Sequence, residues 1–250
     1  MTTMSLRWLA YGRWQLLDYL WQRLLLPLGL ASLITFFMFY GSASMTDRPG
    51  FWAEPDGLRF AALLLKQSMT TFIPLAVLMA MNGLVGQDRQ KGYFRFLFSK
   101  PVPVPGFYVS AFVIHLVVAA VAAGTVAAVL GAASAPQPIV GTALACALTF
   151  VLLGSLMFLL STLTYQDGVV FLAIWVGTIL MRQVEPTLRA GHWMHSAVRL
   201  LPPTHRLDAV RDALYAAQPV QANDVWHVLA YGGACFVLAV MAVRKLPLAR

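Results

Sequence analysis

The sequence predicts an all-α integral membrane protein with six transmembrane helices, an N-terminal interfacial helix, and short external or re-entrant helices before the last span. Hydrophobic residues make up 59% of the 250 residues and charged residues only 11%, whereas ordinary soluble domains are roughly 45–50% apolar. The mean hydropathy is +0.71. Several uncharged runs approach the about 20 residues that a helix needs to cross a bilayer. No repeat or change in composition divides the chain, so we expect one transmembrane domain over residues 1–250.

Six apolar runs predict the spans. The first lies between Trp21 and Tyr40, aromatic residues of the kind found at membrane interfaces. The segment from Pro101 to Gln166 contains no Asp, Glu, Lys or Arg. Because it is too long for one helix, we divide it at Gly131–Gly141, where two prolines and several small residues suit a turn. The expected spans are residues about 24–40, 67–86, 107–130, 139–163, 168–181 and 226–243.

The residues before the first span predict an interfacial helix over about 5–22. Apolar residues recur there at helical spacing, beside a polar stripe: Ala10, Trp14, Leu17, Trp21 and Leu24. Such a helix lies at headgroup depth, with its tryptophans in the interface. Two alternatives stay open. The segment extends the first span as one long helix, or the first run is a cleaved signal sequence, against which its length argues.

The fifth run is short for a full crossing of the membrane. Part of the following segment, Pro186–Leu201, is therefore a candidate for a re-entrant piece in the outer leaflet. The sequence THRLDAVRDALYAAQP follows two prolines and places Leu207, Val210 and Leu214 on one helical face. Charged residues occupy the rest of its circumference, which predicts an amphipathic helix before the last span.

The distribution of Lys and Arg predicts the orientation. With the N-terminus in the cytoplasm, ten basic residues lie inside and eight outside, and +7 of the net charge of +8 falls inside. The positive-inside rule then places both termini in the cytoplasm, and Asp47–Gly57 and Pro202–Asp224 outside. We expect a multi-pass protein of the cytoplasmic (inner) membrane. This topology accounts for the pI of 9.9, so the basic charge gives no reason to expect nucleic acid as a partner.

The sequence contains no pattern typical of an active site. None of its lysines precedes Ser or Thr, so it has no Walker A motif for ATP. His192 and His195 are spaced i, i+3, as metal or haem ligands on one helical face can be, but no third ligand follows and we interpret them as interfacial. Cys146 and Cys235 fall within expected spans, where thiols behave as small buried hydrophobes. We expect no catalytic residue, metal or cofactor in this chain.

Charged residues are concentrated in the loop after the second span, which has the sequence QDRQKGYFRFLFSK. We expect this loop to form a cytoplasmic helix over about 87–100. On a helix its polar residues share one stripe with a glycine gap: Asp88, Lys91, Gly92, Arg95 and Ser99. The aromatic residues lie on the opposite side. The helix should end by Lys100, because the following PVPVP is stiff and extended. The alternative is an ordinary basic loop that only sets orientation.

The segment GQDRQKGYFRFLFSKPVPVPGFYVSAFV resembles the one that permease subunits of type-2 ABC exporters carry between their second and third spans. The pattern is an acidic residue, a basic run, a glycine, a hydrophobic stretch ending in serine, and then basic-Pro-Val. The matching residues here are Asp88, Gly92, Leu97-Phe98-Ser99 and Lys100-Pro101-Val102. Three departures are Tyr93 where threonine is common, Pro103-Val104 where serine-arginine often follows, and Asp where Glu is usual.

The resemblance implies the permease subunit of an ATP-driven exporter, which pairs with a second copy or a paralogue and rests on two ABC ATPase subunits. ATP and Mg would bind to the ATPase, and this chain would form the path through the lipid membrane without covalent chemistry. The loop helix would dock on the ATPase, and the turn Thr162–Gly168 would add a second contact. The implied coupling residues are Asp88, Arg89, Lys91, Gly92, Phe94, Arg95, Ser99, Tyr165, Gln166 and Asp167.

A second class of function stays open. The chain would then be a membrane anchor subunit of a multi-subunit enzyme or electron-transfer complex, with haem bound through His115 or His227. The transported substrate is not defined by the sequence. Small external loops and few charges within the spans favour a lipid-like or amphipathic molecule, but related permeases carry many cargoes.

Overall fold

The computed structural model describes residues 12–41, 48, 50–86, 88, 103–184 and 200–245, and every element in these ranges is a helix. Five of the described helices are long and apolar enough to cross a membrane: Gly12–Met38, Pro55–Met81, Val104–Ala133, Ile139–Leu163 and Ala222–Lys245. The helical architecture expected from the sequence is therefore confirmed, and the chain is compatible with a multi-pass membrane protein.

The N-terminal helix differs from the expected pair of elements. Residues 12–41 form one uninterrupted helix, which contains the π-helical segment η1 (Tyr19–Leu24) and continues as α2 (Leu25–Gly41). No break separates an interfacial helix over 5–22 from a span over 24–40, and the helix continues through Pro27 and Gly29, which follow the expected boundary. The alternative of one long helix describes residues 12–41; residues 5–11 lie outside the described part.

The second span begins earlier than the expected residue 67. Helix α4 runs from Pro55 to Met81, with its proline in the first turn, where the missing N–H is no loss. Its extra turns carry Arg59 and Lys66, whose exposed side chains do not interrupt the helix. The helix ends before residue 86, at a turn in which Gly83 has a φ of 70°, a backbone conformation that glycine adopts at little cost.

The remaining long helices match the expected spans closely. Helix α7 (Val104–Ala133) covers residues 107–130, and α13 (Ala222–Lys245) covers 226–243. The expected span 139–163 consists of α8 (Ile139–Thr149), the π-helical segment η3 (Phe150–Gly154) and α9 (Ser155–Leu163). Helix α10 (Asp167–Val184) is longer than the expected 168–181 but is not among the five membrane-length helices of the described chain.

The expected amphipathic helix is present as α12 (Thr204–Tyr215). Its apolar face is buried, with Leu207 and Val210 each 2% exposed. It packs against α8 and α13. The residues proposed as a re-entrant piece, 186–201, lie almost entirely outside the described part of the chain, so that prediction is not tested. A short 3-10 helix, η2 (Phe51–Ala53), precedes α4.

One close contact in the core lies where α13 meets the η3 segment. A Cβ atom at Gly232 would lie 2.5 Å from the carbonyl oxygen of Val151, so only glycine allows this approach of the two backbones. Further along both helices the rings of Phe236 and Phe158 lie 5.9 Å apart. From the first contact to the second, the residue number increases in both helices. Helix α13 therefore runs in the same direction as α8–α9.

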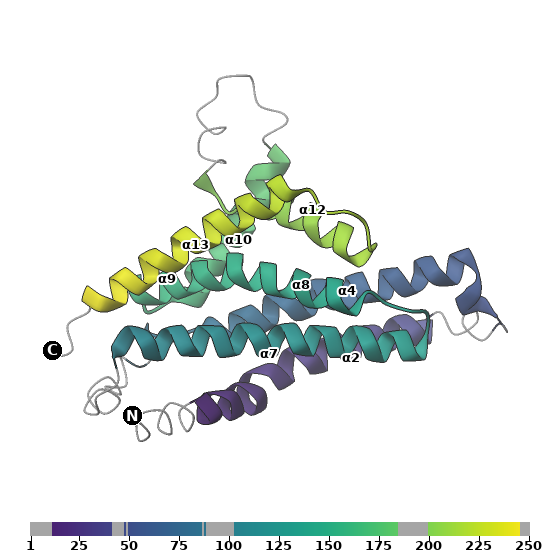
Figure 1. Cartoon of the computed structure of the whole chain (residues 1–250), viewed down its shortest axis with the longest axis horizontal. Helices are drawn as coiled ribbons and strands as arrows, with labels where there is room; N and C mark the ends of the chain where they lie inside the picture. The colour runs from purple at the N-terminus through teal and green to yellow at the C-terminus, as the bar shows by residue number, and fades with distance from the viewer. Residues whose placement is uncertain are drawn as a thin grey trace.

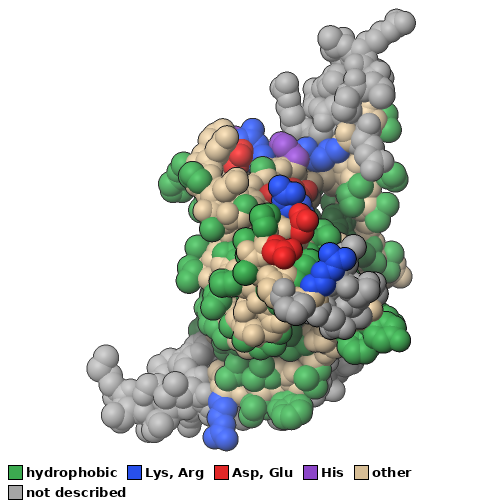
Figure 2. Space-filling view, turned by 90° about the vertical axis from the view of Figure 1, so that its right-hand side faces the viewer, with side chains coloured by type: hydrophobic (Ala, Val, Ile, Leu, Met, Phe, Trp, Pro, Cys, Tyr) green, Lys and Arg blue, Asp and Glu red, His purple; other side chains and the backbone are tan. Residues whose placement is uncertain are grey.

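The long helices lie side by side, and two ends of the molecule can be distinguished (Figure 1). The start of the N-terminal helix, the end of α4, the start of α7 and the end of α13 gather at the left of the view, which we call the junction end. The opposite α12 end carries side chains of both charges, beside an otherwise largely apolar surface (Figure 2). Large apolar side chains remain exposed along the helices, as contact with lipid requires: Phe36, Phe37, Val121, Val176 and Val237 are examples.

Candidate functional site at the end of α4

The turn that ends α4 is held by an aspartate from a distant part of the chain. The backbone N–H of Gly83 donates to Asp167 Oδ2 at 2.7 Å, and the N–H of Gly168 donates to Asp167 Oδ1 at 2.9 Å. Both carboxylate oxygens are therefore used inside the protein, and Asp167 is 2% exposed. The carboxylate joins the α4 turn to the start of α10.

The charge state of Asp167 reflects two opposing effects. Burial is the larger and raises the pKa of its carboxyl above the ordinary value, while the N–H donors of Gly83 and Gly168 lower that pKa. Its position in the first turn of α10 also favours the ionised form, since the N-terminus of a helix carries a partial positive charge. Asp167 thus acts as a cap for two backbone segments at once.

Two glycines allow the same segments to approach closely. A Cβ atom at Gly168 would lie 2.8 Å from Asn82 Oδ1, and one at Gly86 would lie 3.3 Å from the carbonyl oxygen of Thr164. The first distance is too short for any real Cβ contact, and the second is tight. The turn after α4 therefore packs directly against the turn between α9 and α10: at Gly86 the two backbones are close, and at Gly168 the side chain of Asn82 lies against the backbone of α10.

The N-terminal helix holds α4 from another side. The guanidinium of Arg23 donates to the carbonyl of Ala80 at 2.9 Å and, more weakly, to that of Met79 at 3.4 Å. These carbonyls belong to the last turn of α4, where a cation is favoured by the helix dipole and by unsatisfied acceptors. Asp18 lies 3.9 Å from Arg23 and adds a weak ion pair.

The start of α7 completes the junction. Tyr108, which is fully buried, donates its hydroxyl to Asp88 Oδ2 at 3.0 Å. Gln15 of the N-terminal helix donates to the carbonyl of Phe107 at 3.5 Å and accepts from the hydroxyl of Ser110 at 3.3 Å. The two ends of the charged loop are consequently anchored: Asp88 at its start contacts α7, which begins just after its end.

The structure describes four of the predicted coupling residues: Asp88, Tyr165, Gln166 and Asp167. Asp88 lies in the junction, partly buried. Tyr165 is 54% exposed and Gln166 is exposed, as a surface contact requires. Asp167 lies in the same turn, where its carboxylate is buried and caps two backbone segments. The other predicted residues lie outside the described part of the chain: Arg89, Lys91, Gly92, Phe94, Arg95 and Ser99.

Sequence reasoning missed the residues that hold the junction from within. Arg23 was counted only as a basic residue that sets orientation, and Tyr108 only as part of a span. The Asn82-Gly83 dipeptide carried a usable signal, because Asn-Gly marks a turn, but it lay inside the run assigned to the second span. Nothing in the sequence alone pairs residue 83 with residue 167.

The histidines considered as haem ligands are engaged in ordinary contacts. The ring of His115 packs on Tyr19 with centroids 4.3 Å apart, and His115 is 4% exposed. His227 Nδ1 lies 2.7 Å from the carbonyl oxygen of Asn223 and 3.1 Å from Arg206. His192 and His195 lie outside the described residues.

Metal ligands do not cluster in the described ranges, where no three His, Cys, Asp or Glu side chains come together. Comparison with protein-family models and with curated proteins finds no match to this chain. The functional interpretation therefore depends on the junction itself and on the residues of the loop that it anchors.

Proposed function

We propose that the chain is the permease subunit of a type-2 ABC exporter, and that the junction at the end of α4 passes movement from an ATPase subunit to the spans. The observation that carries the proposal is the set of contacts around residues 82–88. This segment leads directly into the charged loop, and it is bonded to α10 through Asp167 and to α7 through Tyr108. A force applied to the loop would reach several helices at once.

The proposal includes six spans with both termini in the cytoplasm. Helices α9 and α13 run in the same direction, so the proposal places a return crossing between them and assigns it to α10, the longest described helix between the two. Helix α10 begins at Asp167, whose carboxylate accepts from the N–H of Gly83. Near the other end of α10, Arg182 donates to the carbonyl of Pro202, just before α12. Its 18 residues are about 27 Å long, close to the roughly 30 Å of the hydrocarbon core.

The mechanism follows from how the junction is built. Hydrogen bonds from Arg23 and to Asp167 tie the last turn of α4 to the N-terminal helix and to α10. When ATP, with Mg, closes the partner ATPase subunits, the loop helix would be displaced and these helices would tilt together. The path for the substrate would form between two permease copies, or a copy and a paralogue, in the cytoplasmic membrane. This chain would bind neither ATP nor a metal.

Charge reversal in the loop tests the proposal. Lys91→Glu with Arg95→Glu should remove two favourable contacts to the ATPase, each worth about 1–3 kcal/mol, so the affinity for the ATPase should fall by about 30-fold or more. The matched control is Arg244→Glu with Lys245→Glu, which makes the same change of charge at the end of α13, on the same side of the membrane.

The measurement is the amount of ABC-type ATPase subunit that co-purifies with tagged chain from native membranes, quantified by mass spectrometry at equal amounts of permease. We expect the loop variant to lose the ATPase and the α13 variant to retain it. Equal retention by both variants, or no ATPase with the unaltered chain, would refute the coupling role. A Soret absorbance band in the purified protein would instead support the anchor-subunit alternative.

A further inference from the structure

The membrane-length helix Ile139–Leu163 is not a regular α-helix along its whole length. Its central residues, Phe150–Gly154, form the π-helical segment η3, and α8 and α9 are regular on either side of it. A π-turn holds about one residue more than an α-turn, because its hydrogen bonds join residues five apart rather than four. Such turns are rare, occur often at functional sites, and are among the few places where long helices bend.

Two glycines accommodate the wider turn. A Cβ atom at Gly154 would lie 2.9 Å from the ring of Phe150, which is fully buried and folds over this glycine. From α13, the backbone at Gly232 approaches the backbone of Val151 closely enough that a Cβ there would lie 3.0 Å from the carbonyl carbon of Val151. Because both glycines lack a side chain, the ring and the two backbones fit around η3.

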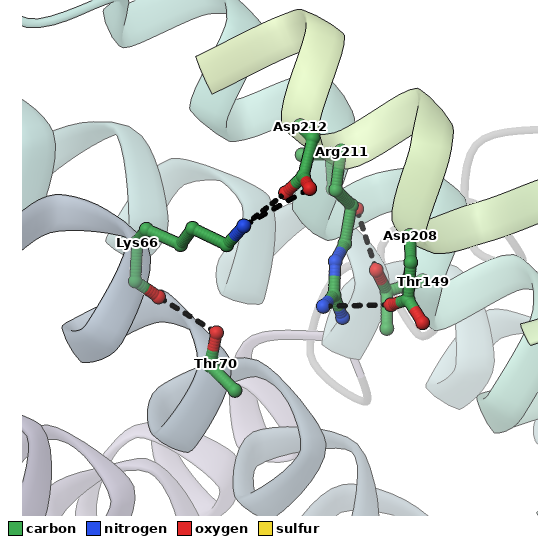
Figure 3. A network of polar contacts seen from close by, with 7 residues as sticks. Lys66, Thr70, Thr149, Asp208, Arg211 and Asp212 are labelled. Carbon is green, nitrogen blue, oxygen red and sulfur yellow. Dashed lines mark hydrogen bonds and ion pairs between the residues drawn. The ribbon is translucent and has the colours of Figure 1, made fainter. Parts of the chain in front are cut away.

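The two halves of this span pack against different helices. Helix α8 packs mainly against α7 and α12, and α9 mainly against α13 and α10 (Figure 1). The contact of α8 with α12 is close, since a Cβ atom at Gly141 would lie 2.5 Å from the carbonyl oxygen of Leu214. Figure 3 shows Arg211 of α12 extending toward Thr149, the last residue of α8.

The other half of the span is held at the junction. Helix α9 leads into the turn before α10, where the carboxylate of Asp167 accepts from the N–H of Gly83 after α4. The segment η3 therefore separates a half that is fixed to α12 from a half that is fixed to the junction end.

Aromatic rings surround η3 and form much of its contact with neighbouring helices. The ring of Phe112 on α7 lies 5.4 Å from that of Phe150, 6.2 Å from that of Phe158 and 4.8 Å from that of Phe236. Offset, tilted and edge arrangements of such rings are all favourable. A small change of angle between α8 and α9 would therefore alter the ring angles without separating the rings.

We propose that η3 is a hinge in the fourth membrane-length helix, about which α9 and the start of α10 change their angle to α8 and α12. The hinge depends only on this chain, whereas its use in transport rests on the proposed function. In that function, displacement of the junction by the ATPase would move α9 through the α9–α10 turn. Helix α8 would keep its close contact with α12, because the bend at η3 takes up the difference.

The spread of distances across η3 tests the hinge in the purified chain, without an ATPase. The measurement is double electron–electron resonance in lipid nanodiscs, on protein in which both native cysteines are replaced by alanine. Spin labels at Val140→Cys and Leu163→Cys lie on exposed sites of α8 and α9, about 34 Å apart along the span. The control labels, at Val113→Cys and Val129→Cys, lie on exposed sites of α7, which is a regular α-helix, about 24 Å apart.

We expect the distribution of distances across η3 to be about twice as wide as the distribution along α7, because bending adds to the spread from the labels themselves. Equal widths would overturn the proposal. This result does not depend on whether an ATPase co-purifies with the chain, so the hinge and the proposed function can fail separately.

Two pairs of adjacent leucines provide matched deletions. Deleting Leu153, next to Leu152, removes one residue from η3 and should leave a continuous α-helix in which α8 and α9 keep their neighbours. Deleting Leu160, next to Leu159, removes the same side chain from regular α9 and rotates the residues that follow by about 100°. Both leucines are buried, so we expect the second deletion to lower the melting temperature by about 5 °C or more beyond the first.

The deletion of Leu153 should also narrow the distribution between labels at 140 and 163 to the width measured along α7. A distribution that stays wide after this deletion would show that the bending does not occur at η3, and would overturn the proposal. If the shortened protein does not fold, the comparison of the two label pairs in the complete span decides the question alone.

Discussion

Replacing Asp167 by alanine tests whether the junction is held from within. The substitution removes the only carboxylate that accepts from the N–H groups of Gly83 and Gly168 in the described structure. Gly83 is buried, so water does not replace the lost acceptor. The turn after α4 and the start of α10 would lose the contact that joins them, and both would be less stable.

The magnitude follows from the contacts. A buried N–H left without a partner costs about 1–3 kcal/mol, and loss of a side-chain cap at a helix start adds about 1 kcal/mol. A total of about 2–4 kcal/mol would lower the melting temperature by about 4–12 °C, taking about 2–3 °C for each kcal/mol in a chain of this size. Asp167→Asn keeps one acceptor oxygen and should lose about half as much.

The assay is thermal unfolding of the purified protein in detergent, followed with a dye that fluoresces on reaction with newly exposed thiols. Both cysteines are buried and report loss of the core. Gln166→Ala is the matched control, because Gln166 is the exposed neighbour of Asp167. If Asp167→Ala melts within about 1 °C of the control, the carboxylate is not the structural tie described here.

Three further predictions concern other parts of the fold. Gly232→Ala should lower the melting temperature by several degrees, because the added Cβ would lie 2.5 Å from a carbonyl oxygen of η3. The control Gly233→Ala adds a Cβ with nothing within 4 Å and should leave the melting temperature unchanged. Equal effects of the two substitutions would contradict the close packing at Gly232. Lys66→Ala breaks the 2.9 Å ion pair between Lys66 and Asp212 of α12, whose two side chains are about half exposed. The substitution should lower the free energy of unfolding by only about 0–1 kcal/mol. A loss of several kcal/mol in the same assay would contradict this prediction. In protein lacking native cysteines, Ser44→Cys and Gln218→Cys should react with an impermeant thiol reagent from outside intact cells, and labelling of the latter only after lysis would overturn the six-span topology.

Much of the fold was predictable because hydrophobic periodicity and turn residues determine helices locally. The prolines at 136 and 138 located the turn between α7 and α8, and the apolar face of α12 was identified at Leu207 and Val210. The errors have local causes as well. The second span was expected to begin at residue 67, after the charged Arg59 and Lys66, but α4 begins at Pro55 and carries both residues on an exposed face.

The site was less predictable, because its contacts join residues far apart in the sequence. The sequence predicted that the charged loop, which includes Asp88, and the turn Thr162–Gly168 would each contact a partner. They were expected to do so as two separate surfaces. The structure brings the two turns together: their backbones are close at Gly86, the side chain of Asn82 packs on Gly168, and the buried carboxylate of Asp167 accepts from Gly83. An aspartate in a short turn has the same appearance in a sequence whether it faces solvent or caps a distant backbone N–H.

Helix α4 connects the two polar regions of the molecule, and this bears on how a signal would travel. Lys66, near the middle of α4, pairs with Asp212 of α12 (Figure 3), and the carbonyl of Ala80 in the last turn of α4 accepts from Arg23. These residues belong to one continuous helix, whose rise puts them about 21 Å apart. The ion pair at the α12 end is half exposed and weak, while the contacts at the junction are buried or partly buried and include charge-assisted hydrogen bonds, which are stronger. A displacement of the junction would therefore move α4 as a body and break its contact with α12 first.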